Sequence, residues 1–215
     1  MSPSKLKMRH VVMGVLSLIG VLSATAWPAT AAETATESVR STIDAVVRIL
    51  ENKELKNPDR AEERRRKLEK AIGDRFSYDE MAKRALGAQW TKLNEKQRQE
   101  FVGLFQRLLS NTYAGKIEGY SGEQVKYLNE RLKEGNAEVR TKITSGKAEV
   151  PLDYRLLNKS GEWRVYDVVV DGISLVNNYR GQFSKILRSS SYDDLVEKLR
   201  NKSDTFAAPK EETSK

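Results

Sequence analysis

The sequence lacks cysteine altogether and contains one histidine, His10, among its 215 residues. We predict that His10 is removed with an N-terminal export signal. The mature chain then lacks both residue types that most often serve as nucleophile, general base or transition-metal ligand. The nearest approach to a hydrolase motif, residues 172–176 (Gly-Ile-Ser-Leu-Val), lacks the second glycine of a nucleophile elbow. We therefore expect a protein that is not an enzyme and that carries no cofactor and no metal.

The sequence also lacks a hydrophobic run suited to crossing a membrane. The apolar run at residues 11–21 follows three basic residues and is interrupted by Gly and Ser, and residues 29–31 (Ala-Thr-Ala) suit a signal peptidase. We predict a cleaved signal peptide over residues 1–31, rather than an uncleaved anchor, and a single domain over residues 32–201. Residues 202–215 are polar and unpatterned, which predicts a disordered tail.

Acidic residues are too few to balance the basic ones. The formal net charge is +8, and removal of residues 1–31, which hold three Lys or Arg and no acid, leaves about +5. An exported protein is not expected to meet nucleic acid, which leaves an anionic lipid surface or an acidic protein as the partner. The basic run at residues 64–67 has glutamates beside it, so a solvated helix face is the alternative to a docking site there.

Apolar residues recur at helical spacing through the first half of the mature chain. The pattern predicts an amphipathic helix over residues 36–50 and a highly charged helix over residues 58–72. The few apolar residues of the charged helix indicate a surface position with little contribution to the core. Ser77 and Asn94 each precede a Glu or Gln by three residues, which predicts capping boxes at two further helices. The second of these carries a wide apolar stripe of Phe101, Leu104, Phe105, Leu108, Leu109 and Tyr113.

Beyond the long helix the periodicity changes to strand-like alternation. Four strands are predicted, joined by turns of hairpin composition, near residues 123–133, 137–144, 148–158 and 162–170. A two-residue turn at residues 145–146 would pair Thr141 with Val150 and Val139 with Leu152. The apolar residues of both strands then share one face of the sheet.

The fourth strand, residues 162–170, has apolar side chains on both faces, as expected of a strand that is covered on two sides. The length of the preceding turn is not fixed by the sequence, so the face that Trp163 takes is open. Asp167 interrupts the apolar run and either bonds a neighbouring amide or base or belongs to a ligand site. Ser174 then caps a helix whose apolar stripe includes Tyr179.

The last strand and the helix after it carry a specific motif. It consists of Tyr166-Asp167-Val168, residues 171–176, Asn178-Tyr179-Arg180 and Gln182-Phe183. This motif closely resembles the toluene-tolerance (MlaC) family of periplasmic phospholipid-binding proteins, and the resemblance extends over about residues 36–199. It implies an α+β fold in which helices pack on a curved four-stranded antiparallel sheet. The implied shape is nuclear-transport-factor-like and encloses an apolar cavity.

The resemblance also implies a function. In this family the acyl chains of a phospholipid enter the cavity, and the protein moves lipid through the periplasm of a Gram-negative bacterium to maintain outer-membrane lipid asymmetry. The implied partners are an outer-membrane lipoprotein–porin complex and an inner-membrane ABC transporter with its lipid-binding domain subunit, and we expect a monomer. Two acyl chains of about sixteen carbons prefer hydrocarbon over water by on the order of 20 kcal/mol, so a carrier must enclose its cargo but needs no catalytic group.

Apolar residues of the long helix, the sheet and the closing helix are the expected lipid contacts, and each of them could instead fill a packed core. They are Phe101, Phe105, Leu108, Leu109, Tyr113, Val139, Ile143, Val150, Leu152, Tyr154, Val168, Val170, Tyr179 and Phe183. Arg180 would lie at the head-group rim, where a guanidinium can bind a phosphate through two parallel hydrogen bonds, or would pair with Asp167 or Asp171. The alternatives are a hopanoid-associated lipid-binding protein and a periplasmic interaction module that binds no lipid.

Overall fold

The structure, a computed structural model, describes residues 33–146 and 148–201, so the predicted signal peptide and tail lie outside the described residues. Five strands pair antiparallel in the order β1-β2-β3-β4-β5. The predicted α+β class and its four antiparallel strands are confirmed, and a fifth, two-residue strand extends the sheet beside β4. The elements are α1 (Ala35–Glu51), η1 (Pro58–Arg60), α2 (Ala61–Gly73), α3 (Tyr78–Leu86), η2 (Gly87–Lys92), α4 (Glu95–Glu118), β1 (Gln124–Lys133), β2 (Asn136–Ser145), β3 (Ala148–Lys159), β4 (Glu162–Val170), β5 (Ile173–Ser174), α5 (Leu175–Ser189) and α6 (Tyr192–Arg200).

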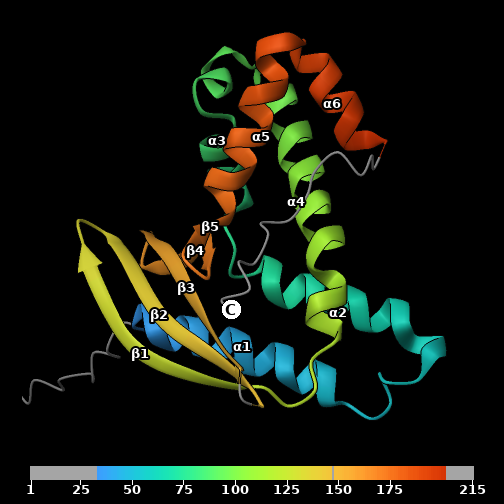
Figure 1. Cartoon of the computed structure of the whole chain (residues 1–215), viewed down its shortest axis with the longest axis vertical. Helices are drawn as coiled ribbons and strands as arrows, with labels where there is room; N and C mark the ends of the chain where they lie inside the picture. Colours follow the sequence, from blue (N-terminus) through green and yellow to red (C-terminus); the bar gives the residue numbers. More distant parts are fainter. Residues whose placement is uncertain (1–32, 147, 202–215) are drawn as a thin grey trace, which may run out of the picture. The chain divides into compact units, whose positions relative to one another are not determined.

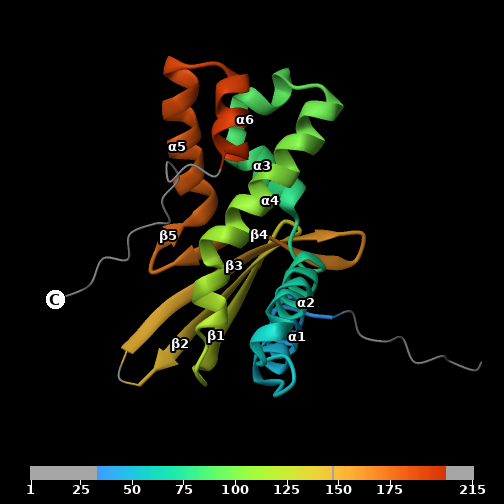
Figure 2. The same cartoon turned by 90° about the vertical axis from the view of Figure 1, so that its right-hand side faces the viewer.

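Two hydrophobic cores hold these elements together. In one core α1 lies against the sheet, where Ala35 and Val39 pack with Val139 and Leu156. In the other, α3, α5 and α6 pack with α4. Figures 1 and 2 show α4 running from this group of helices toward the end of the domain where α1, α2 and the sheet lie.

Aromatic rings fill the helical core. Phe101, Phe105, Tyr179 and Phe183 are all 0% exposed. The Phe105 ring meets the Tyr179 ring edge-to-face at 5.5 Å and the Phe183 ring at 5.7 Å, and the Phe101 ring meets the Phe183 ring at 5.6 Å. Edge-to-face pairs at such separations add stabilisation beyond the burial of their area. These contacts therefore fix α5 against α4.

One of the two predicted capping boxes forms. The Asn94 side chain accepts from the Gln97 amide at 2.9 Å, and the Gln97 side chain accepts from the Asn94 amide at 3.0 Å, which confirms the predicted start of α4. The prediction of a capping box at Ser77 is wrong, because the Ser77 hydroxyl instead donates to the Asp79 carboxylate at 2.7 Å. The Ser77 amide donates to the Val165 carbonyl at 2.8 Å, which ties this residue to β4 with backbone angles unlike those of a usual N-cap.

The register of β2 with β3 differs from the prediction by two residues. Thr141 pairs with Leu152 and Val139 pairs with Tyr154, because Ser145 pairs with Ala148 at the end of the hairpin. A slip of two residues keeps every side chain on its predicted face, since side chains alternate with a period of two. The predicted pairs are therefore wrong, whereas the predicted faces are unchanged.

A β-bulge in β4 decides the faces that the sequence left open. Arg155 pairs with Asp167 and Leu156 pairs with Val165, so Tyr166 has no opposite residue. Val165 consequently packs in the sheet core with Trp163 beside it, whereas Tyr166 packs against the helical core. The extra residue turns β4 so that it contributes to both cores.

Asp167 connects β4 to the start of α5. Its carboxylate is buried, accepts from the Ser174 hydroxyl at 2.6 Å and from the Val176 amide at 3.1 Å, and pairs with Arg155 at 3.1 Å. Ser174 in turn accepts from the Asn177 amide at 3.0 Å, which confirms the predicted cap of α5. Asp167 therefore bonds both an amide and a base, and a carboxylate at the first turn of a helix is stabilised by the helix dipole.

We expect Asp167→Asn to lower the free energy of unfolding by about 2–4 kcal/mol, because the amide turns an NH₂ group toward buried donors and removes the charge that Arg155 faces. Asp171→Asn is the matched control, since Asp171 is exposed with φ 47°, a region that Asn tolerates. Urea unfolding of both variants measures the difference. Equal losses at the two positions would contradict a bracing role for Asp167.

Candidate functional site

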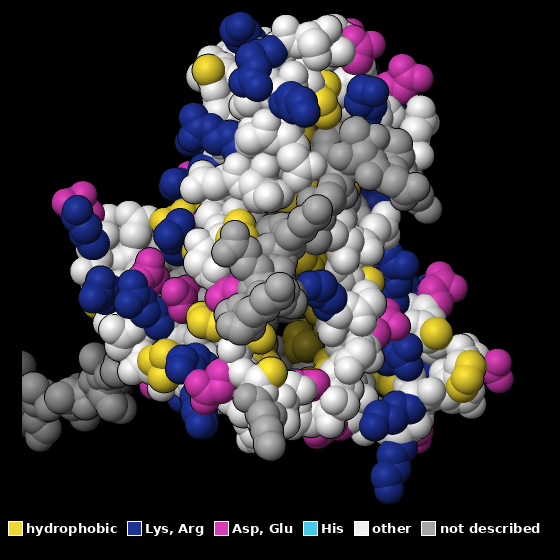
Figure 3. Space-filling model, in the orientation of Figure 1, with side chains coloured by type: hydrophobic (Ala, Val, Ile, Leu, Met, Phe, Trp, Pro, Cys, Tyr) yellow, Lys and Arg dark blue, Asp and Glu magenta, His cyan; other side chains and the backbone are white. Residues whose placement is uncertain are grey.

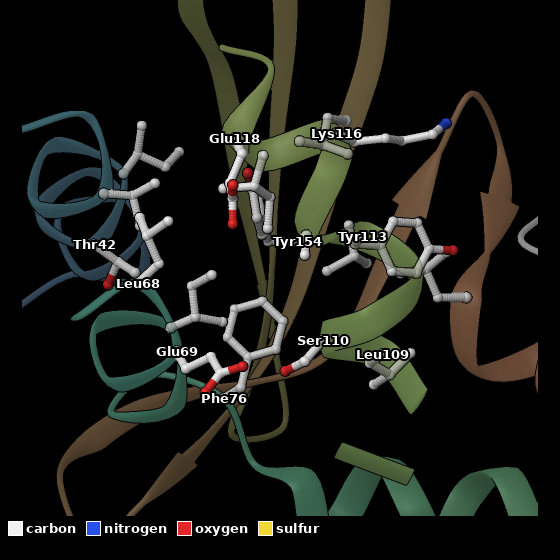
Figure 4. A pocket seen from close by; sticks show the side chains of 18 of the residues that line it. Thr42, Leu68, Glu69, Phe76, Leu109, Ser110, Tyr113, Lys116, Glu118 and Tyr154 are labelled. Atoms are coloured by element: carbon white, nitrogen blue, oxygen red, sulfur yellow. The ribbon is translucent and has the colours of Figure 1, made fainter. Parts of the chain in front are cut away.

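An apolar pocket of about 300 Å³ lies between α1, α2, α4 and the sheet. Figure 3 shows a hollow with hydrophobic side chains at its base, in the region where α1, α2 and the end of α4 meet. In Figure 4, Leu68 and Phe76 line one side of the pocket, Leu109 and Tyr113 of α4 line the other, and Tyr154 of β3 lies behind them. The apolar lining residues are Ile43, Val46, Leu68, Ile72, Phe76, Tyr78, Met81, Leu109, Tyr113, Ala114, Ile117, Leu152, Tyr154, Val168, Val170 and Leu175.

The lining comes from elements far apart in the sequence. The amphipathic face of α1 supplies Ile43 and Val46, and the sparse apolar side of α2 supplies Leu68 and Ile72. The alternating face of β3 supplies Leu152 and Tyr154, and the same alternation in β4 supplies Val168 and Val170. The pocket therefore forms where two helical stripes and one sheet face meet without filling the space between them.

Polar side chains line the same pocket from α2 and from the C-terminal part of α4. They form ion pairs and hydrogen bonds there: Glu69 pairs with Arg65 at 3.1 Å, and Glu118 pairs with Arg64 at 3.1 Å. Arg65 also donates to the Asn111 side chain at 2.6 Å, so two arginines of α2 bond α4 through side chains. The carboxylates are compensated, and the charged groups connect two helices that border the pocket.

Burial raises the pKa of two tyrosines of the wall, Tyr78 and Tyr154. Burial, with a smaller contribution from the Glu69 charge, raises the pKa of Tyr78 to about 12. Burial likewise raises the pKa of Tyr154 above its ordinary value, and the nearby Tyr127 raises it further. Both side chains therefore contribute aromatic surface without charge at neutral pH.

The structure brings six of the predicted lipid contacts to this pocket. They are Leu109, Tyr113, Leu152, Tyr154, Val168 and Val170. It places the other apolar candidates elsewhere: Phe101, Phe105, Tyr179 and Phe183 fill the helical core with Leu108 packed against it, Val139 lies in the sheet core, and Ile143 pairs with Val150 outside the pocket lining. Arg180 lines a different pocket and does not pair with Asp167, which binds Arg155 instead.

The predicted lipid contacts include no residue of the first two helices, although both helices line the pocket. Leu68, which is 4% exposed, and Ile72 line the pocket from the predicted buried side of α2. Among the described residues, neither hydrophobic core includes a residue of α2, so the expectation that this helix contributes little to the core is confirmed. The sequence of α2 shows this apolar spacing, but its many charged residues are also typical of a helix without a role in a binding site. The helix packs on α1 through a narrow apolar stripe and keeps its charged side chains on the remaining surface.

Neither a metal centre nor a membrane span is evident over residues 33–146 and 148–201. No group of three or more His, Cys, Asp and Glu side chains in these ranges is placed to hold a metal ion. Among the same residues, no helix combines the length and apolar character that crossing a bilayer requires. The site contains apolar surface and paired charges.

These features define a class of α+β proteins in which helices and an open antiparallel sheet form an apolar pocket between them. The model of the MlaC protein family matches residues 40–201 of the chain. The protein therefore belongs to the MlaC family, and the resemblance seen in its C-terminal motif is confirmed.

Individual relatives agree with this assignment. The chain is 29% identical over 122 residues to the intermembrane phospholipid transport system binding protein MlaC of Haemophilus influenzae, over 54% of this chain and 57% of that protein. It is 27% identical over 129 residues to the toluene tolerance protein ttg2D of Pseudomonas putida, over 59% of this chain and 60% of that protein. The chain thus spans less than two thirds of the length of these curated relatives.

A solved structure shares the fold. The phospholipid-binding protein from Ralstonia solanacearum, determined in complex with a phospholipid, superposes with a TM-score of 0.71 and 25% sequence identity. The match covers 78% of this chain and 95% of that chain. The arrangement of helices on an antiparallel sheet is therefore common to both proteins.

Proposed function

We propose that this protein is a periplasmic phospholipid carrier, which holds the acyl chains in the apolar pocket and performs no covalent chemistry. The observation that carries the proposal is the pocket itself, whose wall combines aliphatic and aromatic side chains from α1, α2, α4 and the sheet. The Ralstonia solanacearum relative is named for phospholipid binding, and the Haemophilus influenzae relative for intermembrane phospholipid transport, which supports the same cargo here. The N-terminal sequence supports export of the chain by a cleaved signal.

The carrier would exchange lipid with complexes in both membranes. In this proposal it meets an outer-membrane lipoprotein–porin complex on one side and an inner-membrane ABC transporter with a lipid-binding domain subunit on the other. The excess of basic residues favours docking to acidic surfaces, and such docking weakens as salt screens the charges.

Uptake of a lipid requires the pocket to widen. A volume of about 300 Å³ lies at the lower end of the range for ligand pockets, and a phospholipid with two chains needs more room. Arg64–Glu118 and Arg65–Asn111 join α2 to α4 beside the pocket through side chains. Side-chain contacts of this kind separate at small energetic cost, so α2 and α4 are the elements that we expect to move apart.

Lipid analysis tests the proposal directly. The mature protein is purified without detergent and extracted with organic solvent, and the extract is examined by mass spectrometry. We expect phospholipid in an amount comparable to the protein, and uptake from phospholipid vesicles after the protein has been stripped of lipid.

Each outcome of that experiment distinguishes between candidate functions. A protein that yields no lipid and takes up none from vesicles would contradict the carrier role and favour a lipid-free interaction module. An extract that contains a hopanoid in place of phospholipid would identify the hopanoid-associated alternative.

A further inference from the structure

A second pocket, of about 420 Å³, lies on the opposite side of β4 from the apolar pocket. Val168 of β4 lines the apolar pocket, whereas the adjacent Asp167 and the bulged Tyr166 line the second one, and the two pockets share no lining residue. Its remaining walls come from α3, η2 and α5. A ligand in this pocket would therefore leave the apolar pocket free.

The second pocket carries an uncompensated positive charge. Its acids are already engaged, since Asp167 pairs with Arg155 at 3.1 Å and Glu80 pairs with Arg84 at 2.8 Å and with Lys83 at 3.6 Å. Arg180 forms no salt bridge with any residue that the structure describes. Arg180 is an exposed residue and lines the second pocket.

The Arg180 guanidinium lies beside Gly87. A Cβ atom at this position would be 3.3 Å from Arg180 Nε and 3.5 Å from Nη2, and the backbone has a φ of +57°. Both the close approach and the positive φ favour glycine. The absence of a side chain at Gly87 therefore leaves the space that the Arg180 guanidinium occupies.

Aromatic side chains complete the pocket. The Arg84 guanidinium stacks over the Tyr166 ring at 4.1 Å from its centroid while it pairs with Glu80, and Trp90 lines the pocket from η2. Figure 3 shows Lys and Arg side chains gathered over α5 and the neighbouring helices. Arginine and large aromatic residues together are typical of the centres of protein–protein interfaces.

We infer that this pocket receives a carboxylate from an acidic segment of a partner protein. Guanidinium groups bind carboxylates through paired, charge-assisted hydrogen bonds. The lining holds two such groups: Arg180 beside Gly87, and Arg84, which stacks on Tyr166 and already pairs with Glu80. Glu80 and Asp167 in the same lining disfavour a doubly charged phosphate more than a singly charged carboxylate. The site goes beyond the proposed carrier function, because it adds a surface for protein recognition that is separate from the cargo.

Peptide binding tests this inference on the complete mature chain. The probe is a short fluorescein-labelled peptide of alternating Glu and Ser, and the same peptide with Gln in place of Glu is the reference. We expect the Glu peptide alone to bind, and Arg180→Gln or Arg84→Gln to weaken its binding about tenfold, as for the loss of one charge-assisted pair. Arg188→Gln is the matched control, because Arg188 is exposed on the same helix and lines neither pocket.

Tryptophan fluorescence tests whether the peptide binds in this pocket. After Trp163→Phe, Trp90 is the one tryptophan that remains in residues 32–215 of the sequence. Its emission is expected to change on addition of the Glu peptide and to stay constant with the Gln peptide. A peptide that binds without changing this emission would lie elsewhere and would overturn the assignment.

Two further results would overturn the inference. Equal weakening of peptide binding by Arg180→Gln and Arg188→Gln would show attraction to net charge alone. Displacement of the peptide by inorganic phosphate at lower concentration than by glutamate would show a phosphate site.

Lipid content is measured on the same variants and is expected to be unchanged. Loss of both lipid and peptide in Arg180→Gln would assign Arg180 to cargo binding, whereas lipid-free protein that still binds the peptide would contradict only the carrier role.

Discussion

Replacement of Phe105 by alanine is expected to lower the free energy of unfolding by about 3–5 kcal/mol, because it removes a large, fully buried ring and leaves a cavity. The ring makes edge-to-face contacts with Tyr179 and Phe183, and both contacts join α4 to α5. Chemical unfolding followed by circular dichroism measures the loss. The effect is one of stability, since Phe105 lies in the helical core and outside the lining of the apolar pocket.

Phe76→Ala is the matched comparison for this prediction. Phe76 is half-buried, stacks with Tyr78 at 6.0 Å and lines the apolar pocket. We expect a smaller loss of stability than in Phe105→Ala and a larger loss of bound lipid. If Phe105→Ala removed lipid from a protein of unchanged stability, the assignment of Phe105 to the core would be contradicted.

Replacement of Leu152 by glutamate is expected to reduce the bound phospholipid at least tenfold. Leu152 lies in the pocket wall on β3, where a carboxylate would be desolvated by acyl chains at a cost of several kcal/mol, and each 1.4 kcal/mol changes an affinity tenfold. The side chain is partly exposed to the pocket, so the fold itself should persist with reduced stability. Extraction and mass spectrometry, together with circular dichroism on the same sample, measure both quantities.

Val150→Glu is the control for Leu152→Glu. The two residues lie two positions apart on the same face of β3, and Val150 pairs with Ile143 outside the pocket lining. Lipid content is expected to remain near that of the unmodified protein in this variant. Equal losses of lipid at both positions would show that the lipid contacts more of the sheet than the described pocket, and unchanged lipid in Leu152→Glu would refute the wall assignment.

Local chemistry explains which predictions from the sequence are confirmed. Asn94 and Ser174 cap their helices as predicted, because a cap requires only a side-chain oxygen and an amide two or three residues away. The strands follow from alternation, and the predicted faces of β2 and β3 survived a wrong register because the side-chain period is two. Helix caps and the alternation of strand side chains depend only on residues that are close together in the sequence.

Long-range contacts explain the predictions that are wrong. Ser77 has the sequence of a capping box, yet its amide bonds Val165, a residue 88 positions later in the numbering of the chain. The bulge at Tyr166 depends on how β3 meets β4, and no property of residue 166 alone requires it. Competing tertiary hydrogen bonds therefore override a local signal where the chain returns to itself.

The sequence by itself determined the α+β class, the order of helices and strands, the resemblance to the MlaC family and the scarcity of catalytic residue types. Only the tertiary structure decided which apolar residues line the pocket: it brought Leu68 and Ile72 of a charged helix to the wall and enclosed Phe105 and Tyr179 in the helical core. The physical reason is that periodicity reports which side of an element is apolar. What that side meets depends on the distances between elements, and a pocket forms where facing apolar surfaces do not come into contact.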